Sequence, residues 1–519
     1  MDTKALRQKI LDLAIRGKLV PQDPNDEPAS VLLERIRAEK QQMVKEGKLK
    51  AKDIKNDTVI FVGEDNLHYE KFPDGSVKCI EEEIPFALPQ GWEWCRLQHF
   101  VDFIGGSQPP KSTFEYVATE ENIRLIQIRD YKSNNYLTYI PRSKAKRFCN
   151  KNDIMIGRYG PPIFQILRGL EGAYNVALMK AVANSCIIIN DYLFYLLQDS
   201  KLLKTLESFS DRTCGQDGIN MYELNRYIVG IPPIAEQLRI IHQLETIFPI
   251  IDSITANKEI LGSLINQTKS KILDLAIRGK LVPQDPNDEP ASVLLERIRA
   301  EKENLIKQGK IKRDKKESVI FRGEDNSYYR ISSYNKSYRE QLYELPANWS
   351  ICTLPDIAKI DLGKTLDTSK NTGKPHSYLR SVNVRWCNID LSDLKEMLIE
   401  DEELERYSVQ KNDLLICEGG DVGRSCVWTS NETICYQNAL HRVRLYDKCN
   451  PFFFMYYMMH YESKGIIKDM CKGVTIKHLT GNVLSTIPFS LPPVSEQNRI
   501  VNAIESAFAQ LDEIANAIA

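Results

Sequence analysis

Apolar residues recur at helical spacing through the middle of the chain. Many of the gaps between them are three or four residues, which predicts a long helix that buries one stripe of its surface. The apolar positions are Ile234, Leu238, Ile241, Phe248, Ile251, Leu261, Ile265, Ile272 and Leu275. Two prolines precede the run and Glu236 lies in its first turn, as is typical of a helix start. A helix over 234–279 would be about 69 Å long at roughly 1.5 Å per residue.

The pattern also predicts how this helix is interrupted, ends and packs. Pro249 lies inside the run and should kink the helix. Gly279 should end it, and the turn "VPQDPNDEP" then leads to a shorter helix that stops near Gly309. We expect Leu238 and Ile241 to pack into a helix–helix seam, because apolar stripes of this kind are normally buried.

The chain contains the same sequence twice. The 32 residues "KILDLAIRGKLVPQDPNDEPASVLLERIRAEK" occupy 9–40 and again 271–302. Weaker matches join 58–70 to 318–330, 87–97 to 344–354, 151–160 to 411–420, and 231–254 to 491–514. Between these landmarks the two halves diverge almost completely. A shared frame that encloses two variable interiors is the simplest interpretation.

The order of the repeated pieces predicts a circularly permuted repeat. In the middle of the chain "PPIAEQ" continues directly into "KILDLAIRGKLVPQ". At the ends of the chain the same sequence is split between 491–519 and 4–40. We therefore expect a mixed α/β protein with pseudo-twofold symmetry, in which two long antiparallel, coiled-coil-like helical spacers separate two α/β domains.

The repeat also predicts five parts of the chain. The variable interiors contain strand-like segments such as "NIRLIQIRDY", "NDIMIGRYG" and "HRVRLYD". The basic stretches 45–56 and 307–316 could contact phosphate or could be solvated linkers. The expected parts are an N-terminal helical part (1–50), a first variable domain with its basic linker (51–231), a central helical spacer (232–312), a second variable domain with its linker (313–490) and a C-terminal spacer helix (491–519).

Composition limits the class of protein. Hydrophobic residues make up 42% and charged residues 27% of the 519 residues, as in ordinary globular proteins. The net charge is −1, so any basic surface for nucleic acid must be local. No signal-peptide core or membrane span is recognisable, and twelve cysteines occur without a Cys-x-x-Cys pair. These features predict a cytoplasmic protein with reduced thiols and without a zinc site.

Catalytic motifs are missing or incomplete. An adenine methyltransferase needs Asn or Asp before Pro-Pro-aromatic, but "GPPIF" at 160–164 has glycine there. A phosphate-binding loop needs Gly-x4-Gly-Lys-Ser/Thr, but "AKIDLGKT" at 358–365 begins with alanine. The seven histidines form no metal-ligand pair. The chain is therefore expected to be non-catalytic and to bind no metal or cofactor.

The two "[IL]PPxxEQ" helix starts, the two "LDLAIRGKLVPQ" segments and the two interiors of similar length resemble the specificity subunit of type I restriction–modification systems. The resemblance covers essentially the whole chain. It implies that each interior is a target recognition domain that reads one half of a bipartite site in double-stranded DNA. It implies that the helices set the gap and dock two methyltransferase subunits, and that restriction (translocase-nuclease) subunits complete the complex. S-adenosylmethionine, ATP and Mg²⁺ would then belong to those partners, whose activities would require this subunit.

The hydrogen-bonding preferences of side chains for bases and phosphates indicate which residues of this chain would contact DNA. Arg can bind guanine, Gln or Asn can bind adenine, and Lys can bind phosphate. Polar-rich turns of the first domain supply the candidates Gln127, Arg129, Lys132, Arg158, Tyr159, Gln165, Arg212 and Gln216. The second domain supplies Arg380, Asn383, Arg385, Trp386, Arg424, Gln437, Asn438, Arg442, Lys472, Thr475 and Lys477. Asp153 and Asp413, in the paired "KND" segments, should form turns.

Two other functions are compatible with parts of this pattern. A single-chain restriction or modification enzyme would share the repeat, but it would need the cofactor and nuclease motifs that the sequence lacks. A coiled-coil scaffold without DNA binding would share the helices, and it would show no salt-dependent binding to DNA.

Overall fold

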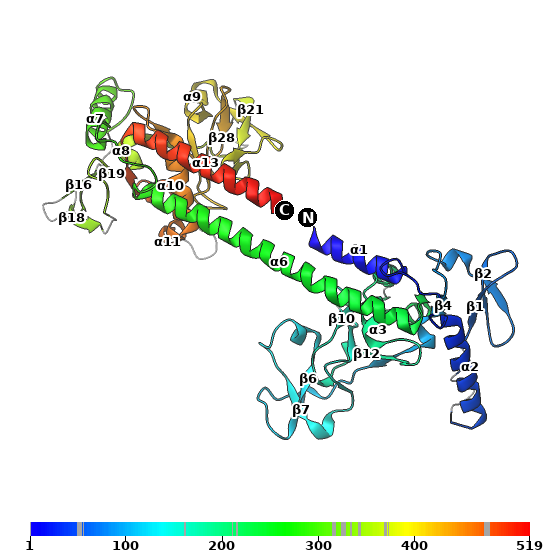
Figure 1. The fold of residues 1–519 in the computed structure, drawn as a ribbon. Coiled ribbons are helices and arrows are strands. Elements are labelled where there is room, and N and C mark those ends of the chain that lie inside the picture. Colours follow the sequence, from blue (N-terminus) through cyan, green and yellow to red (C-terminus); the bar gives the residue numbers. More distant parts are fainter. Residues whose placement is uncertain are drawn as a thin grey trace. The chain divides into compact units, whose positions relative to one another are not determined.

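The computed structural model describes residues 2–518 except 49–53, 55–56, 160–161, 210, 214–215, 314–317, 323–327, 333–334, 341–343, 368–370, 372 and 472–477. The chain forms two compact units, Met1–Asn257 and Lys258–Ala519. The division falls inside the long helix α6 (Ile234–Ile277), which begins in the first unit and ends in the second (Figure 1). The predicted long helix is thus present, and it runs through Pro249 without a break in its assignment.

Two helices and the first part of α6 form the frame of the first unit. α1 (Thr3–Ile15) runs antiparallel to α6, as two contacts show. The guanidinium of Arg7 lies 2.8 Å from the carboxylate of Asp252, and the Thr255 hydroxyl lies 2.9 Å from that of Thr3. α2 (Ala29–Lys45) follows a proline-containing turn. The buried side chains of α1 and α2 join one apolar core with those of α6 and of the first variable domain.

The second unit repeats this frame with a different chain connection. α13 (Val494–Ile518) runs antiparallel to the last part of α6, where the Lys269 ammonium lies 2.5 Å from the Asp512 carboxylate. α7 (Ala291–Lys307) takes the place of α2. In the first unit the helix paired with α6 is N-terminal, and in the second unit it is C-terminal. This is the connection that a circularly permuted repeat predicts.

The repeated "PPxxEQ" motif joins each frame to its variable domain. The buried Glu236 carboxylate accepts hydrogen bonds from the indole of Trp92 (3.0 Å) and the amide of Gln22 (3.1 Å). In the second unit the buried Glu496 carboxylate accepts from Trp349 (2.9 Å) and Gln284. A helix start, a turn of the frame and a strand segment therefore meet at one carboxylate in each unit.

The next residue of the motif completes this junction. The Gln237 amide donates to the carbonyls of Pro232 and Ile187 and accepts from the N–H of Ile189. The Gln497 amide donates to the carbonyl of Pro492 and accepts from the N–H of Asn450. We call these two groups the junctions: Glu236 and Gln237 with their partners in the first unit, and Glu496 and Gln497 with theirs in the second.

The first variable domain contains two four-stranded sheets, ordered β10-β9-β12-β5 and β7-β6-β11-β8, with the pair β4–β15, the hairpin β13–β14 and a three-stranded sheet β1-β2-β3. Its strands are β1 (Val59–Val62), β2 (His68–Lys71), β3 (Val77–Cys79), β4 (Glu93–Arg96), β5 (Val101–Gly105), β6 (Asn122–Ile126), β7 (Tyr139–Pro141), β8 (Phe148–Cys149), β9 (Ile154–Gly157), β10 (Gln165–Leu167), β11 (Gly172–Tyr174), β12 (Leu178–Ala183), β13 (Asp211–Thr213), β14 (Gln216–Gly218) and β15 (Ile228–Ile231). Its helices are α3 (Asn190–Leu196), α4 (Ser200–Ser208), α5 (Met221–Arg226) and the short 3-10 turns η2 (Glu81–Glu83), η3 (Leu97–His99), η4 (Lys111–Thr113), η5 (Ile128–Tyr131) and η6 (Arg142–Lys144).

The second variable domain has sheets of the same order, β27-β26-β29-β20 and β24-β21-β28-β25, with the pairs β19–β30 and β22–β23 and a three-stranded sheet β16-β17-β18. Its strands are β16 (Ser318–Arg322), β17 (Tyr328–Ser332), β18 (Asn335–Glu340), β19 (Ser350–Thr353), β20 (Ala358–Leu362), β21 (Lys374–Leu379), β22 (Val384–Arg385), β23 (Asn388–Ile389), β24 (Lys395–Ile399), β25 (Ser408–Val409), β26 (Leu414–Cys417), β27 (Ser425–Val427), β28 (Ile434–Tyr436), β29 (Leu440–Leu445) and β30 (Pro488–Leu491). Its helices are α8 (Leu354–Ile357), η7 (Asp401–Glu403), α9 (Leu404–Tyr407), α10 (Pro451–Ser463), α11 (Ile466–Met470) and α12 (Gly481–Leu484).

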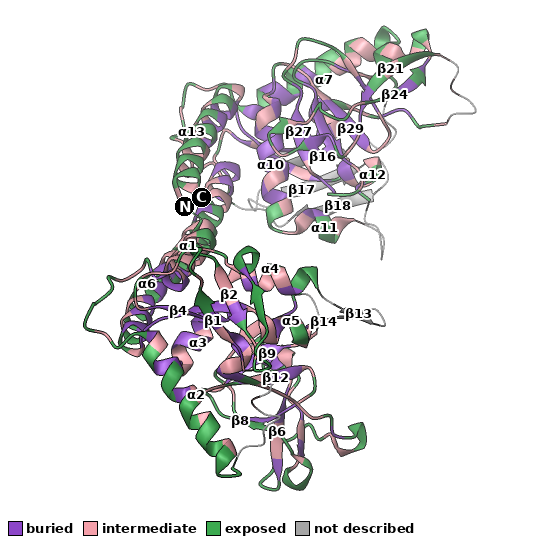
Figure 2. Ribbon diagram, turned by 90° about the vertical axis from the view of Figure 1, so that its right-hand side faces the viewer, coloured by how far each residue is buried: buried purple, intermediate pink, exposed green. Residues whose placement is uncertain are grey.

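The two domains share their strand pairing although their sequences diverge. β6 lies parallel to β11, with Ile126 opposite Tyr174, and β21 lies parallel to β28, with Leu379 opposite Tyr436. Both tyrosines are buried, and their hydroxyls donate to the carbonyls of Ile104 and Asp361. Equivalent strands can therefore be matched across the two units (Figure 2 shows their buried cores).

Two details of the predicted helices and strands differ from the structure. Leu238 is 55% exposed, whereas Ile241 is buried, so only the second lies in the predicted seam. The strand expected through "NIRLIQIRDY" ends at Ile126, because Gln127 caps the turn η5. By contrast, the turns expected at Asp153 and Asp413 are present. Their carboxylates accept from the N–H groups of Asn150 and Gln410 three residues earlier.

Candidate DNA interface

The turn after β6 holds two of the candidate residues in a fixed geometry. The Gln127 side chain accepts from the Asp130 N–H, and the Asp130 carboxylate accepts from the Gln127 N–H at 3.1 Å. Asp130 is buried, and burial raises the pKa of its carboxyl. Gln127 also donates to the Thr138 hydroxyl at 3.2 Å, so its amide supports the loop.

Arg129 projects from this turn into solvent. Its side chain is 52% exposed, and its guanidinium lies over the ring of Tyr136, 5.6 Å from the centroid. The same guanidinium donates to the Tyr136 carbonyl at 3.4 Å. Tyr136 is itself 67% exposed, and Lys132 is exposed at the end of the turn. A cation and an aromatic ring presented together are the chemistry that binds nucleic acid bases and phosphates.

The remaining described candidates of the first domain are less free. The Arg158 guanidinium lies 5.3 Å from the ring centroid of Tyr159, and both residues are half-buried. Gln165 donates from its amide to the Pro162 carbonyl at 3.0 Å. Arg212 and Gln216 belong to the hairpin β13–β14, but their side chains lie outside the described part of the structure.

In the second domain an equivalent turn follows β21. The N–H of Arg380 donates to the Asn383 side chain at 2.9 Å, which corresponds to the Gln127–Asp130 contact of the first domain. The Arg380 guanidinium is bound by Asp393 at 2.7 Å. Arg385, at the end of β22, is exposed, and Trp386 packs partly buried against the core. Arg385 is thus the freest candidate of this turn.

Two candidates of the second domain must be corrected. Asn383 is 2% exposed, and its amide donates to the carbonyls of Asp390 and Asp393. Arg442 is 1% exposed, and its guanidinium binds the Asp361 carboxylate and the Ser408 carbonyl. Neither side chain has exposed surface with which to contact a base, so the prediction is wrong for both residues. Their polar groups form hydrogen bonds inside the domain instead.

The other candidates of this domain are mostly engaged within it. Arg424 pairs with Asp421 and donates to the Ser381 carbonyl at 2.9 Å. The Asn438 amide approaches the Thr365 hydroxyl at 3.4 Å. Gln437 is half-buried, and its side-chain oxygen has no hydrogen-bond partner among the described residues. Lys472, Thr475 and Lys477 lie outside the described residues.

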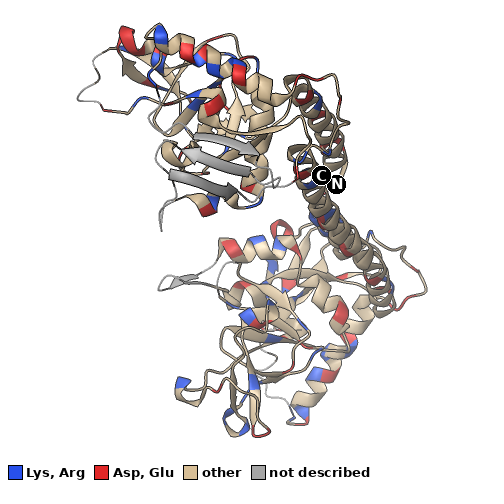
Figure 3. Cartoon of the chain, turned by 90° about the vertical axis from the view of Figure 1, so that its left-hand side faces the viewer, with Lys and Arg blue, Asp and Glu red and all other residues tan. Residues whose placement is uncertain are grey.

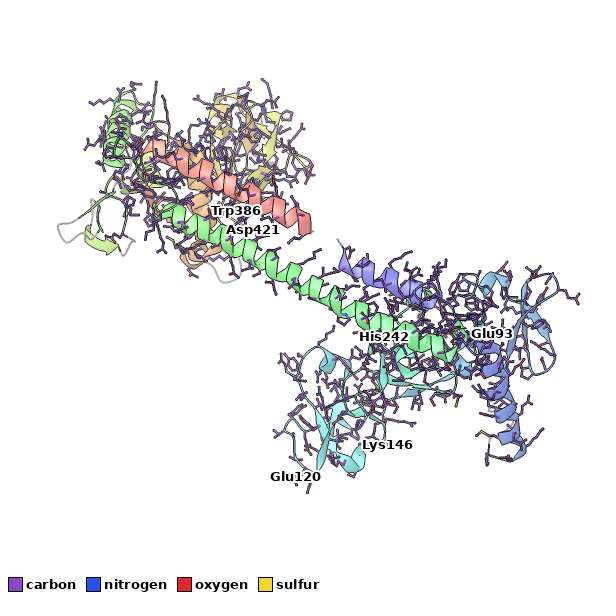
Figure 4. The ribbon with its side chains drawn as sticks, in the orientation of Figure 1. Glu93, Glu120, Lys146, His242, Trp386 and Asp421 are labelled. Atoms are coloured by element: carbon purple, nitrogen blue, oxygen red, sulfur yellow. The ribbon has the colours of Figure 1, made fainter. Side chains whose placement is uncertain are left out.

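The sequence reasoning missed one exposed basic segment of the first domain. Residues 142–147, "RSKAKR", link β7 to β8 and contain four basic residues in six. Lys146 and Glu120 lie in the part of the first unit away from α6 (Figure 4). Charge density was the available signal, since no other segment of that interior has so many cations in six residues.

The Gly-Lys-Thr sequence examined as a phosphate loop has a structural role. The Lys364 ammonium is nearly buried and forms ion pairs with Glu400 (2.7 Å) and Glu403. A Cβ on Gly363 would lie 2.2 Å from the Gln437 carbonyl oxygen, so glycine is required there by close backbone contact. Among the described residues no group of three or more His, Cys, Asp or Glu could hold a metal ion. Within the same residues, none of the helices combines the length and the apolar character that a membrane span needs.

Comparisons with known proteins show which solved structure has a similar fold and which proteins have similar sequences. The structure aligns with a solved structure titled "Structural basis underlying complex assembly and conformational transition of the type I R-M system", with a TM-score of 0.55, 17% identity, and coverage of 84% of this chain and 94% of that one. This likeness shows the fold. The specificity subunit of the type I restriction enzyme EcoAI from Escherichia coli is 29% identical, over 97% of this chain and 88% of that protein. The EcoEI specificity subunit from the same organism is 27% identical, over 98% and 90%.

A family model matches the chain twice, once in each half. The model of the type I restriction modification DNA specificity domain matches residues 89–261 and again 346–518. Each match begins just before the tryptophan of a junction and continues through the "PPxxEQ" helix. The two matches together span more than half of the chain and contain the four-stranded sheets of both domains, while the three-stranded sheets β1-β2-β3 and β16-β17-β18 precede the matched residues. The chain therefore belongs to the family of type I restriction–modification DNA specificity subunits.

Proposed function

We propose that this chain selects the DNA sequence on which a type I restriction–modification complex acts, each unit reading one half of a bipartite site. The observation that carries the proposal is the repetition of one two-sheet topology in two units whose exposed turns differ in sequence. At the same place after β6 and β21 the first unit has "QIRDYK" and the second "RSVNVR". One scaffold with two different turns is suited to reading two different half-sites.

The exposed side chains of these turns are the leading candidates for contact with DNA. Arg129 and Arg385 are both exposed, and an arginine can bind the two acceptors of guanine in the major groove. Lys132, at the position equivalent to Arg385, is suited to phosphate. Arg158, Tyr159 and Gln165 remain secondary candidates, because partial burial limits their reach.

A subunit that selects the DNA sequence needs partner subunits that carry out the reactions. Two methyltransferase subunits would dock on the two frames, one on each, and restriction subunits would complete the assembly in the cytoplasm. S-adenosylmethionine, ATP and Mg²⁺ would be bound by those partners. The exposed apolar side chains of α6, among them Leu238 and Ile250, are suited to such docking because they lie on the frame and away from its core.

Genome-wide mapping of adenine methylation tests this proposal. The chain is expressed with its methyltransferase subunits in a host that lacks other adenine methylation. We expect one bipartite motif, two specified half-sites around a gap of fixed length. Methylation by the chain alone would favour the single-chain enzyme. Methylation in the absence of the chain would favour an independent methyltransferase. A complex that shows no salt-dependent binding to duplex DNA and no methylation motif would instead support the scaffold alternative.

A further inference from the structure

Two segments at equivalent places in the two recognition domains have opposite charge. Residues 142–147 link β7 to β8 and begin with the turn η6, and residues 400–407 link β24 to β25 and begin with η7. These links are topologically equivalent, because β7-β6-β11-β8 and β24-β21-β28-β25 are matched sheets. The first link reads "RSKAKR" and the second "EDEELERY". The first therefore contains four basic and no acidic residues, and the second contains five acidic residues and one arginine.

The basic charges of the first link are available to a ligand. Lys144, Lys146 and Arg147 are exposed, and none of them has an ion-pair partner among the residues that the structure describes (Figure 3 colours basic and acidic residues). Arg142 is also exposed and donates only weakly, to the Glu120 carbonyl at 3.3 Å. Unneutralised cations on an exposed segment are suited to phosphate, since binding releases the counterions of DNA.

The strand register brings the last residue of this link to the end of the sheet where Arg129 is presented, whereas the link begins at the opposite end, after Pro141, which pairs with Asn122. The N–H of Tyr174 donates to the Arg147 carbonyl at 3.1 Å, and Tyr174 lies opposite Ile126, the last residue of β6. The turn with Arg129 starts directly after Ile126. The exposed ring of Phe148, 51% accessible, follows Arg147. Arg147 and the candidate base reader Arg129 therefore lie at the same end of this sheet, and the other cations follow the link across the sheet from Arg142 at its opposite end.

The acidic link of the second unit occupies the same position and is unsuited to phosphate. Ser408 lies opposite Cys435, and Cys435 lies opposite Tyr378, so this link also ends beside the turn after β21. Some of its carboxylates are engaged: Lys364 binds Glu400 and Glu403, and Lys374 binds Asp401. Glu402 and Glu405 are exposed and would repel a phosphate backbone.

We infer that residues 142–147 bind the DNA backbone beside the half-site read by the first unit, and that the second unit lacks this contact. The inference rests on the proposed DNA-binding function and deepens it. The two half-sites are then held with unequal ionic contributions. Binding at the first half-site is the more sensitive to salt, and binding at the second depends more on direct contacts with bases.

Salt titration of duplex binding tests the inference with the complex of this chain and its methyltransferase subunits. The probes are a 40-base-pair duplex that carries the motif defined by methylation mapping and a scrambled duplex. The test variant is K144Q/K146Q/R147Q. The matched control is K18Q/K71Q/K204Q, which removes the same charge from exposed lysines elsewhere in the first unit and outside the basic stretch 45–56. A third variant, E402K/E405K, places cations on the link of the second unit.

We expect the test variant to reduce the slope of log Kobs against log salt by about two to three, because each lost phosphate contact contributes about 0.9. The methylated motif should stay unchanged, since phosphate contacts carry no base information. The control should leave the slope unchanged, and E402K/E405K should steepen it. Equal slopes for test and control, or no steepening in E402K/E405K, would overturn the inference. If the unaltered complex neither methylates a bipartite motif nor binds duplex in a salt-dependent way, the proposed function itself fails.

Discussion

The indole N–H of Trp92 donates a hydrogen bond to the carboxylate of Glu236 over 3.0 Å, 144 residues away along the chain. The equivalent pair in the second unit, Trp349 and Glu496, has the same contact at 2.9 Å. Both carboxylates are buried at helix starts that the sequence repeats. These two hydrogen bonds connect the start of a frame helix to the residue just before β4 in the first unit and just before β19 in the second.

Replacing Glu236 by alanine should destabilise the first unit by about 2–4 kcal/mol, because the buried donors of Trp92 and Gln22 lose their shared acceptor. Glu496→Ala should cost a similar amount in the second unit, where Trp349 and Gln284 lose theirs. Urea unfolding gives the size of each effect, and hydrogen exchange shows which unit opens. A loss below about 0.5 kcal/mol for either variant would contradict the buried geometry.

His460 should make the second unit sensitive to acid. Burial lowers the pKa of this imidazole to about 4, from an ordinary value of 6.5. Since the unfolded chain then binds a proton more readily than the folded one, stability is complete above pH 6.5 and is lost as the pH falls toward 4. The contribution amounts to at most about 3 kcal/mol. His460→Gln should flatten the dependence of the unfolding free energy on pH between 4 and 6.5; an unchanged slope would show that His460 does not titrate in this range.

Removing the exposed arginine of either turn should relax one base position. Arg129→Ala and Arg385→Ala should each cost about 1–3 kcal/mol of discrimination, in different half-sites. Lys132→Ala is the matched control, since loss of a phosphate contact weakens all sequences alike. Methylation motifs and duplex competition assays measure the effect. A motif that stays fully specified in both arginine variants would exclude these residues as base readers.

The two readers should be exchangeable. Replacing residues 84–230 with the first recognition domain of another family member should change one half of the methylated motif. The other half of the motif and the gap should stay unchanged, because each domain has its own sheets and belongs to a separate hydrophobic core. Genome-wide adenine methylation of the chimera is the measurement. A simultaneous change in both halves would be incompatible with independent reading.

The length of the frame helices should set the gap in the motif. About seven residues inserted into 255–262 add roughly 10 Å to α6, equivalent to about three base pairs of B-DNA. A matched insertion near 515–519 keeps the partner helix in register. We expect a gap longer by about three base pairs in the methylated motif. Full-rate methylation at the original gap would show that another part of the complex sets the spacing.

The frame could be predicted from the sequence, whereas the side-chain environment of the candidate site could not. The repeated segments and their apolar spacing led to α6, α1 and α13, because helix periodicity is a local signal. Leu238 follows the same periodicity yet is exposed, since the neighbours that would bury it are set by tertiary packing. Asn383 and Arg442 are typical DNA-binding residue types, but other groups bind them inside the fold: Asn383 binds carbonyls of its own loop, and Arg442 binds a carbonyl and a carboxylate that are distant in sequence. The common topology of two diverged interiors is also invisible in the sequence, because it is preserved by strand pairing rather than by residue identity.

The junctions described above have a consequence for how such proteins change. Gln237 binds main-chain atoms of Ile187 and Ile189, and Gln497 binds the main-chain N–H of Asn450. Every amino acid supplies a carbonyl and, apart from proline, an N–H, so these attachments place few demands on the residues that follow them. A recognition domain can therefore accumulate substitutions, or be inherited as a block from another gene, while its connection to the frame is preserved. New DNA targets can arise in this way without any compensating change in the helices.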